Sequence, residues 1–214
     1  MFFSSNFARF MNQTALRILN TAGEKFMRYG IRSVSMDDIA RDLGMSKKTL
    51  YEHFRTKRKL VEEVSVRFIE MDKRAMLEIR EKASDALDEM VRIARYVSET
   101  LQHVPQTTLH DLKKYYQGCW HHFDQFHKDF IYQTIYENIE RGIDEGVYRT
   151  DVNADIMARL YIGKSILIAD QDLFPPNKYP TAVLFRQFIM YHIYGLASAK
   201  GLKQLNKYLV KQKI

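Results

Sequence analysis

Residues 35–54 read SMDDIARDLGMSKKTLYEHF, and this stretch decides the fold. Ser35, followed three positions later by Asp38, is typical of a capping box at the start of a helix. Gly44 stands where a residue in the left-handed conformation ends that helix, and Ser46 can cap the next one. Two short helices joined by so tight a turn predict a helix-turn-helix, in which the second helix enters the major groove of DNA.

A wider set of positions around this stretch resembles the N-terminal signature of the TetR family of bacterial transcriptional regulators. The resemblance is specific because residues of several chemical types stand at fixed spacing over the first third of the chain. Met45 is a mild departure, since Val is commoner there. The matching residues are Phe26, Gly30, Ser35, Ile39, Ala40, Leu43, Gly44, Ser46, Thr49, Leu50, Tyr51, His53, Phe54 and Lys57.

The resemblance implies an all-α protein made of two parts. Residues 12–60 form an N-terminal three-helix helix-turn-helix DNA-binding domain, and residues 61–214 form a C-terminal helical effector-binding and dimerisation domain. Only 4 Pro and 9 Gly, together with long stretches of 3.6-residue periodicity, independently favour an all-α fold. Beyond the motif, helices are expected near 57–82, 84–103, 107–118, 120–145, 153–169, 180–200 and 202–210.

Formal charge is concentrated in the part that contains the helix-turn-helix. Residues 1–60 hold 12 Lys and Arg against 5 Asp and Glu, a net charge of +7, whereas residues 61–214 hold 21 of each. Lys and Arg neutralise phosphates, which is the main sequence-independent term in DNA affinity. A basic segment alone is better explained as a solvated surface. Coupled to the motif, it favours DNA as the partner.

Composition argues against several other classes of protein. A hydrophobic content of 46% with 28% charged residues is typical of a globular chain. Charged residues interrupt the apolar runs, so we expect no membrane span, and the start MFFSSNFARFM has too short an apolar part for a secretion signal. The single Cys119 cannot form an intrachain disulfide. We therefore expect a cytoplasmic protein, whose translation begins at either Met1 or Met11.

The front of the second motif helix carries the candidate base contacts. The N-terminal end of a recognition helix usually meets the base edges. Here that end holds Lys47, Lys48 and Thr49. A lysine can donate to guanine, and the threonine methyl group can pack on a thymine methyl group. For each of these residues taken alone, a solvated surface side chain is the alternative interpretation.

Other residues of the motif are candidates for contacts with the DNA backbone. The resemblance implies that Tyr51, His53 and Lys57 bond phosphates and set the register without reading sequence. Ser35 and the backbone amides near Met36 can add phosphate contacts at the positive end of a helix. A surface role is a weak alternative for Tyr51, which is an exposed aromatic, and a stronger one for His53, which can cap or pack locally.

The segment from Tyr115 to Tyr136 is dense in aromatic residues and histidine, and two interpretations of it stay open. In the first, the aromatic residues recur every three to four positions because they form the buried face of a helix. In the second, some of them line a pocket for an apolar or aromatic effector, since such pockets are mostly hydrophobic. The candidate pocket residues are Tyr116, Trp120, Phe123, His127 and Phe130.

The sequence offers little support for metal binding or catalysis. His121, Asp124 and Gln125 have helical spacing, but a metal site needs three or four convergent ligands, so we expect no metal. The chain lacks GxSxG, a phosphate-loop glycine pattern, HExxH and CxxC. We therefore expect no enzyme and no cofactor, and we interpret Cys119 as a buried, inert thiol.

Two strongly apolar helices are expected near the C-terminus, at 153–169 and 180–200. Their apolar residues cover more of the circumference than one buried face requires. Burial in the chain's own core is one explanation. The family resemblance implies another, in which two helices from each subunit form the four-helix bundle of a homodimer. The candidate interface residues are Leu160, Leu167, Leu184, Phe188 and His192.

These observations together predict a sequence-specific, DNA-binding transcriptional regulator. The resemblance implies a homodimeric repressor that a small-molecule effector releases from an inverted-repeat operator in double-stranded DNA. The helix at 57–82 is expected to be the sole connection between the DNA-binding part and the remainder. The alternative is a nucleoid-associated or structural DNA-binding protein that has the same fold, no effector and weak sequence preference.

Overall fold

The computed structural model describes residues 13–102, 104–105, 107–168, 170, 172–175 and 177–212, so both candidate start positions lie outside it. Helices make up the described part of the chain, apart from turns and one isolated β-bridge between Tyr148 and Ala197. The expected all-α fold is therefore confirmed. None of the described helices has the length and apolar character that crossing a lipid bilayer requires.

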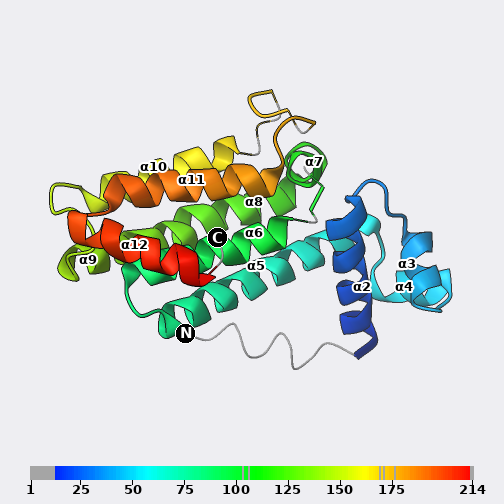
Figure 1. Cartoon of the computed structure of the whole chain (residues 1–214). Coiled ribbons are helices and arrows are strands. Elements are labelled where there is room, and N and C mark those ends of the chain that lie inside the picture. The colour runs from blue at the N-terminus through cyan, green and yellow to red at the C-terminus, as the bar shows by residue number, and fades with distance from the viewer. Residues whose placement is uncertain are drawn as a thin grey trace.

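The first three described helices form an N-terminal module at one end of the molecule (Figure 1). They are α2 (Gln13–Tyr29), α3 (Met36–Asp42) and α4 (Lys47–His53), and they pack with the start of α5 (Lys57–Lys82). Apolar residues at helical spacing meet in one small core, because each helix has a single apolar face. The fully buried members include Ile18, Ala22, Ile39, Leu50 and Leu60.

Local chemistry explains where the motif helices begin and end. The backbone N–H of Asp38 donates to Ser35 Oγ at 3.1 Å, and the backbone N–H of Ser35 donates to the Asp38 carboxylate at 2.9 Å. This reciprocal capping box is the one that the sequence predicts. Gly44 follows α3 with a φ of 63°, and Ser46 Oγ accepts the backbone N–H of Thr49 at 3.1 Å to begin α4.

The long helix α5 connects the N-terminal module to a larger C-terminal bundle. Leu60 and Val61 belong to the core of the module, whereas Ile69 and Met76 belong to the core of the bundle. The border expected between residues 60 and 61 thus lies inside a continuous helix of 26 residues. An unbroken helix therefore joins the two cores.

The C-terminal bundle surrounds α6, most of whose N-terminal half is buried (Figure 1). A five-residue π-helical segment, His127–Ile131, interrupts the helix that continues α8 into α9. The bundle contains α6 (Ala86–Leu101), α7 (Thr107–Tyr115), α8 (Gln117–Phe126), α9 (Tyr132–Asp144), α10 (Ala154–Leu167), α11 (Thr181–Leu196) and α12 (Ala199–Gln212).

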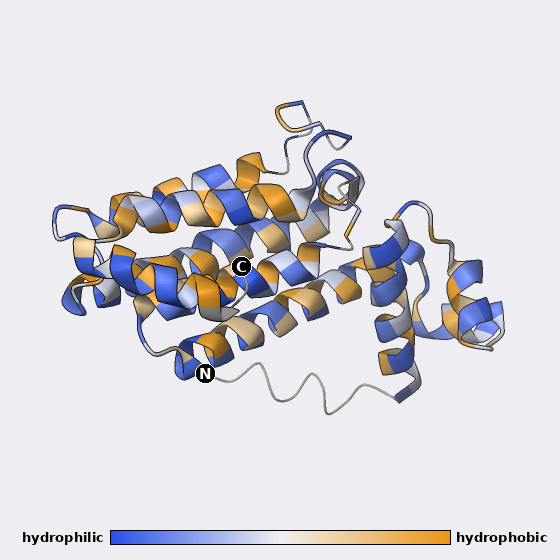
Figure 2. Cartoon of the chain, in the orientation of Figure 1, coloured by the Kyte–Doolittle hydropathy of each residue, from blue (hydrophilic) through white to orange (hydrophobic). Residues whose placement is uncertain are grey.

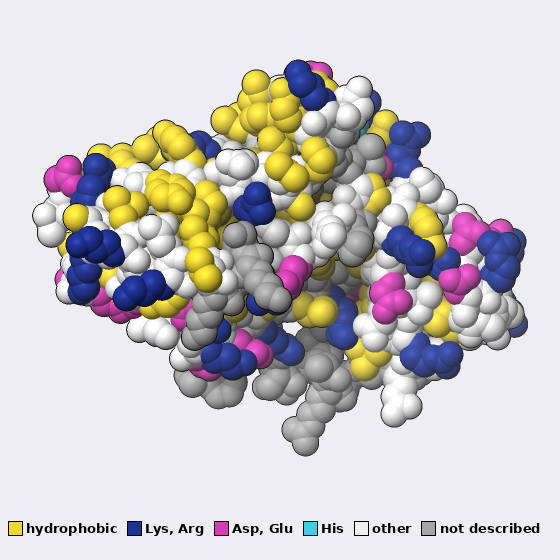
Figure 3. Space-filling model, in the orientation of Figure 1, with side chains coloured by type: hydrophobic (Ala, Val, Ile, Leu, Met, Phe, Trp, Pro, Cys, Tyr) yellow, Lys and Arg dark blue, Asp and Glu magenta, His cyan; other side chains and the backbone are white. Residues whose placement is uncertain are grey.

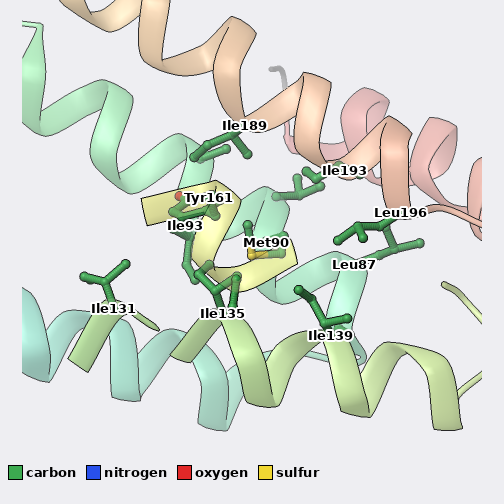
Figure 4. Close-up of a cluster of buried hydrophobic side chains, with 14 of the residues drawn as sticks. Leu87, Met90, Ile93, Ile131, Ile135, Ile139, Tyr161, Ile189, Ile193 and Leu196 are labelled. Carbon is green, nitrogen blue, oxygen red and sulfur yellow. The ribbon is translucent and has the colours of Figure 1, made fainter. Parts of the chain in front are cut away.

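Figure 4 shows how the core of the bundle is assembled around α6. Leu87 and Met90 of α6 face Ile139 of α9 on one side and Ile189 and Ile193 of α11 on the other. All five side chains are fully buried. Burying a side chain of this size contributes about 1.5–3 kcal/mol, so α6 organises the bundle through hydrophobic packing.

The helix boundaries around Gly118 differ from those expected. The sequence predicts one helix ending at Gly118 and another from Trp120, but the observed break lies at Tyr116, whose φ and ψ are −129° and 59°. Gly118 is an ordinary helical residue inside α8. A glycine ends a helix when it adopts the left-handed conformation, and here Gly30, Gly44 and Gly146 do so.

Two glycines allow a tight corner between α9 and α12. Tyr148 is buried there, and its hydroxyl donates to Asn138 Oδ1 at 3.0 Å. A Cβ atom on Gly142 would lie 2.1 Å from the Tyr148 ring, and one on Gly201 would lie 2.0 Å from the carbonyl oxygen of Val147. Only glycine fits at either position without moving its neighbours.

Candidate functional site

The recognition helix α4 is anchored by one face and open on the other. Leu50 and the following Phe54 are buried in the core of the N-terminal module. Lys48 and Tyr51 are exposed, and 43% of the tyrosine is accessible to solvent. An exposed aromatic side chain beside a lysine is the arrangement that the sequence predicts for a surface that contacts DNA.

The two other candidate base contacts already have partners within the protein. Lys47 Nζ forms an ion pair with Asp37 at the start of α3, a contact that sequence spacing did not suggest. The Thr49 hydroxyl lies 2.9 Å from Ser46 Oγ in the cap of α4, so its methyl group is the part free to pack on a base. Lys48 makes no ion pair with any residue in the described part of the chain, so it is the freer of the two lysines.

The start of α3 offers backbone rather than side-chain groups. Met36 is buried in the module core, so a phosphate contact there can involve only its backbone amide. Ser35 is exposed, and its hydroxyl also donates to the Asp38 carboxylate at 2.6 Å. The hydrogen bonds from Ser35 hold the pKa of Asp38 below its usual range.

The structure gives Lys57 a second role. Its ammonium group donates to the backbone carbonyl oxygen of Arg32 at 3.5 Å, so it ties α5 to the turn after α2. Lys57 and His53 are both half-buried, and burial lowers the pKa of Lys57. Lys57 therefore supports the turn near the proposed phosphate contacts whether or not DNA is bound.

The N-terminal module meets the bundle through α7 and α8 as well as through α5. Cys119 is buried in the core of the module, where Leu112 and Tyr116 also pack. The guanidinium group of Arg58 lies 5.7 Å from the centre of the Tyr116 ring. The expectation that α5 is the sole connection is therefore wrong, because the break at Tyr116 folds these helices back onto the module.

A cavity of about 700 Å³ extends from the module into the bundle. Its size is in the range of small-molecule sites. Its wall is mostly apolar, and part of α2 belongs to it. Wall residues from six helices are Met27 of α2, Phe68 of α5, Tyr96 of α6, Trp120 of α8, Tyr161 of α10 and Phe185 of α11.

The structure brings together three of the five candidate pocket residues. Trp120, Phe123 and His127 line the cavity. Tyr116 packs instead against the core of the N-terminal module, and Phe130 packs against the core of the bundle, where its ring stacks on that of Phe126 at 5.6 Å. A helical period of three to four residues places side chains on one broad face, but it does not say which of them border a void.

The wall of the cavity contains an irregular segment. His127 begins the π-helical turn, and its Nδ1 lies 3.0 Å from the backbone carbonyl oxygen of Phe123. The two rings are 4.2 Å apart, and burial lowers the pKa of His127. Single π-helical turns occur frequently at functional sites, which singles out this wall of the cavity.

Burial also shifts the pKa of an aspartate and of a cysteine in the wall. The Tyr96 hydroxyl donates to the Asp72 carboxylate at 2.5 Å, and burial raises the pKa of Asp72 to about 6. The Cys119 thiol also borders the cavity, and burial raises its pKa. The thiol is thus buried, as expected. Asp72, by contrast, was not singled out by the sequence, because it lies in an ordinary charged stretch of α5.

The outer faces of α10 and α11 expose many apolar side chains. Hydrophobic residues run along both helices in Figure 2, and Figure 3 shows apolar side chains gathered over them. Leu160 and Leu167 are 45% and 48% exposed, and Tyr191, which the sequence did not suggest, is 68% exposed. Ile156, Val183 and Tyr194 extend this surface. We use the name α10–α11 face for the six exposed residues Ile156, Leu160, Leu167, Val183, Tyr191 and Tyr194.

The other candidate interface residues are less accessible. Leu184 and Phe188 are half-buried. His192 is only 7% exposed, and its ring packs edge-on against that of Tyr161 at 4.9 Å. Burial lowers the pKa of His192 to about 4. His192 therefore lies in the core of the bundle and not on the α10–α11 face, because α11 is apolar on both its inner and its outer sides.

The part of the chain that the structure describes holds no group of three or more His, Cys, Asp or Glu residues placed to bind a metal ion. Within that part, His121 and Asp124 do not gain a third such ligand.

The fold and the exposed face of α4 define a helix-turn-helix DNA-binding protein. Residues 18–64 match the model of the family described as bacterial regulatory proteins, tetR family. Residues 18–64 are thus a DNA-binding domain of the TetR type, and the chain as a whole is similar to helix-turn-helix transcriptional regulators. A similar protein is the uncharacterized HTH-type transcriptional regulator YvaF from Bacillus subtilis (strain 168). This similarity agrees with the expectation that the chain is a regulator and not an enzyme. YvaF is 25% identical over 158 residues, which are 73% of this chain and 82% of YvaF.

Solved structures of similar fold extend the likeness to the C-terminal bundle. A putative transcriptional regulator from Saccharomonospora viridis, in complex with choline, has a TM-score of 0.68 at 22% identity and covers 88% of this chain and 100% of its own. The reduced form of NemR from E. coli has a TM-score of 0.69 at 9% identity over 87% and 98% of the two chains. At these identities the likeness shows the shared fold.

Proposed function

We propose that this regulator is a homodimeric repressor, acting on cytoplasmic DNA, that leaves an inverted-repeat operator when a small molecule occupies the cavity. Residues 12–60 read the DNA, and residues 61–214 bind the effector and the second subunit. The single observation that carries the proposal is the position of the cavity. Its wall includes α2 of the DNA-binding module together with five helices of the bundle, so one ligand contacts both parts at once.

The second connection between module and bundle supports this mechanism. A ligand beside Trp120 and Phe123 presses on α8, and the neighbouring Cys119 is buried in the core of the module. Two recognition helices must reach successive major grooves about 34–36 Å apart. A ligand that binds better to a conformation with another spacing shifts the population away from the DNA-bound form.

The residues proposed to contact DNA divide into two groups. Lys48 and the methyl group of Thr49 face the bases, with Lys47 released from Asp37 as DNA arrives. The remaining candidates bind phosphates of the DNA backbone and set the position of the protein along the duplex. These are Ser35, the backbone amide of Met36, Tyr51, His53 and Lys57.

Binding to DNA from upstream of the protein's own coding region tests the proposed function. Fluorescence anisotropy would compare this duplex with a scrambled duplex at physiological salt, because affinity for DNA depends strongly on salt. We expect strong preference for the native duplex and its loss when a ligand fills the cavity. Equal binding to both duplexes would favour a nucleoid-associated protein. Failure of a folded protein to bind either one would refute the DNA-binding role of α4.

The proposed dimer leads to a prediction for the α10–α11 face. A second copy of the chain is the proposed occupant, because symmetric association buries the same apolar residues on both subunits. Leu160→Asp combined with Leu167→Asp is expected to convert the dimer to a monomer. Each subunit would bury two carboxylates in the interface, where they would meet the same two carboxylates of the other subunit without a counter-charge. Multi-angle light scattering measures the mass.

Leu202→Asp is the matched control for this prediction. Leu202 is 40% exposed, but it lies on α12 and outside the α10–α11 face. It should leave the mass unchanged, while the Leu160 and Leu167 double variant should also lose operator affinity because each monomer holds only one half-site. A double variant that stays dimeric would place the interface elsewhere.

A further inference from the structure

Asp72 is an anionic group placed in an apolar wall. It lies on α5 and borders the cavity, as does Tyr96 of α6, whose hydroxyl donates to its carboxylate at 2.5 Å. The Tyr96 hydroxyl in turn interacts with the Thr100 side chain. Among the described residues, no lysine, arginine or histidine forms an ion pair with Asp72. The carboxylate thus has one neutral donor and no counter-charge.

The surroundings of Asp72 make a cation the favourable partner. Burial disfavours the ionised form of a carboxyl group unless a positive charge lies nearby, and burial is the main effect on the pKa of Asp72. Aromatic rings stabilise a cation held against their faces. Trp120, Phe123 and Phe126 line the same cavity, and the Trp120 and Phe123 ring centres are 5.6 Å apart.

The other ionisable groups of the wall do not offset this charge. Glu24 of α2 is exposed to solvent, and Arg67 lies five residues before Asp72 on α5. Five residues turn a helix by about 140° and advance it by about 7.5 Å, so the two side chains leave α5 in different directions. Burial lowers the pKa of His127, which keeps that ring neutral at pH 7.

We propose that the effector is an apolar cation, a molecule that carries a protonated amine or a quaternary ammonium group on a hydrophobic body. The cation lies beside Asp72 and the body fills the aromatic part of the cavity. This inference rests on the proposed function, because it names the chemical class of the effector for the same cavity. An anionic ligand would be repelled by Asp72, and a neutral one would leave the carboxylate without a counter-charge.

The test uses three probes with one hydrophobic chain length. Decyltrimethylammonium is cationic, 1-decanol is neutral and decyl sulfate is anionic, and each is used below its micellar concentration. Trp120 is the only tryptophan of the chain and lines the cavity, so its fluorescence reports binding to the full-length protein. We expect the cation to bind at least about ten-fold more tightly than the alcohol, which corresponds to one pKa unit of interaction. The sulfate should bind most weakly.

Asp72→Asn keeps the shape of the side chain and removes its charge. It is expected to weaken decyltrimethylammonium binding by about ten-fold, while the affinity for decanol changes by less than about three-fold. Asp144→Asn is the matched control, because Asp144 is exposed on α9 and does not line the cavity. Thermal melts confirm that each variant folds, and the three-probe comparison on the unmodified protein decides the question even when a variant does not.

The outcomes separate this inference from the proposed function. Tighter binding of decanol or decyl sulfate than of the cation, or an unchanged preference in Asp72→Asn, would overturn the cationic class. Neutral or anionic probes that release operator DNA would overturn it while supporting the proposed function. Cation binding that depends on Asp72 but leaves the protein on its operator would support the ligand class and refute effector release.

Discussion

Replacing Lys48 and Tyr51 together with alanine is expected to weaken operator binding by about two orders of magnitude. Lys48 is the proposed base contact, worth about 1–3 kcal/mol, and a dimer loses it twice. Tyr51 is a proposed phosphate contact and adds to this loss. A hundredfold weakening corresponds to about 2.8 kcal/mol, near the lower end of what these contacts contribute together. Both side chains are exposed on α4, and neither packs in the core of the module, so the fold should be unaffected. Fluorescence anisotropy with the operator duplex measures the affinity.

The structure guides the choice of residues for this double variant. Lys57 is a poor choice because its ammonium group also holds the carbonyl oxygen of Arg32, so its loss disturbs the module without DNA. Lys48 has no such contact in the described part of the chain.

Lys203→Ala is the control for charge alone. Lys203 is exposed on α12, in the helix at the opposite end of the chain from α4. Its replacement lowers the net charge by the same amount per lysine and should change operator affinity little. Equal losses in the control and in the double variant would mean that general charge, and not the face of α4, governs binding.

Gly201→Ala is expected to destabilise the protein by about 3 kcal/mol, the upper part of the range for overpacked cores. The new Cβ atom would lie 2.0 Å from the carbonyl oxygen of Val147, and a backbone atom cannot rotate away as a side chain can. That carbonyl oxygen also accepts the backbone N–H of Ser198 at 2.9 Å, which holds the corner before α12. In a chain of this size the midpoint of thermal unfolding should fall by about 6–12 °C.

Gly118→Ala is the matched control for this substitution. A Cβ built on Gly118 meets no atom within 4 Å apart from its chain neighbours and the nearby backbone of its own helix, although this glycine is also helical. Alanine there should be neutral or stabilise α8 by up to about 1 kcal/mol, because glycine is the poorer helix former. Both melts are run at one protein concentration, since association raises apparent stability. Equal midpoints for the two variants would contradict the steric argument at Gly201.

The N-terminal module is the part that could be predicted from sequence. The capping box at Ser35, the left-handed Gly44 and the cap at Ser46 act through hydrogen bonds and backbone strain within a few residues. Such local interactions depend little on the rest of the chain. The two motif helices therefore begin directly after the predicted caps Ser35 and Ser46, at Met36 and Lys47.

Sequence patterns were less successful where a helix is apolar on two sides. The pattern of apolar residues in α11 predicted that His192 lies in an interface between subunits. In the structure His192 is buried and packs on Tyr161 of the same chain. Tyr191, one residue earlier, is the exposed side chain. Periodicity identifies the faces of a helix, but it does not state which of two apolar faces meets the chain's own core.

The sequence by itself determined the all-α class, the helix-turn-helix and the resemblance of residues 26–57 to the TetR family, because those depend on the spacing of residues that are close together in the chain. Only the tertiary structure decided that the cavity borders the DNA-binding module, that α8 packs on that module through Cys119, and that Asp72 lies in an apolar wall. These features join residues of α2, α5, α6 and α8 that lie tens of positions apart. Their proximity is set by the packing of whole helices, which no local pattern encodes.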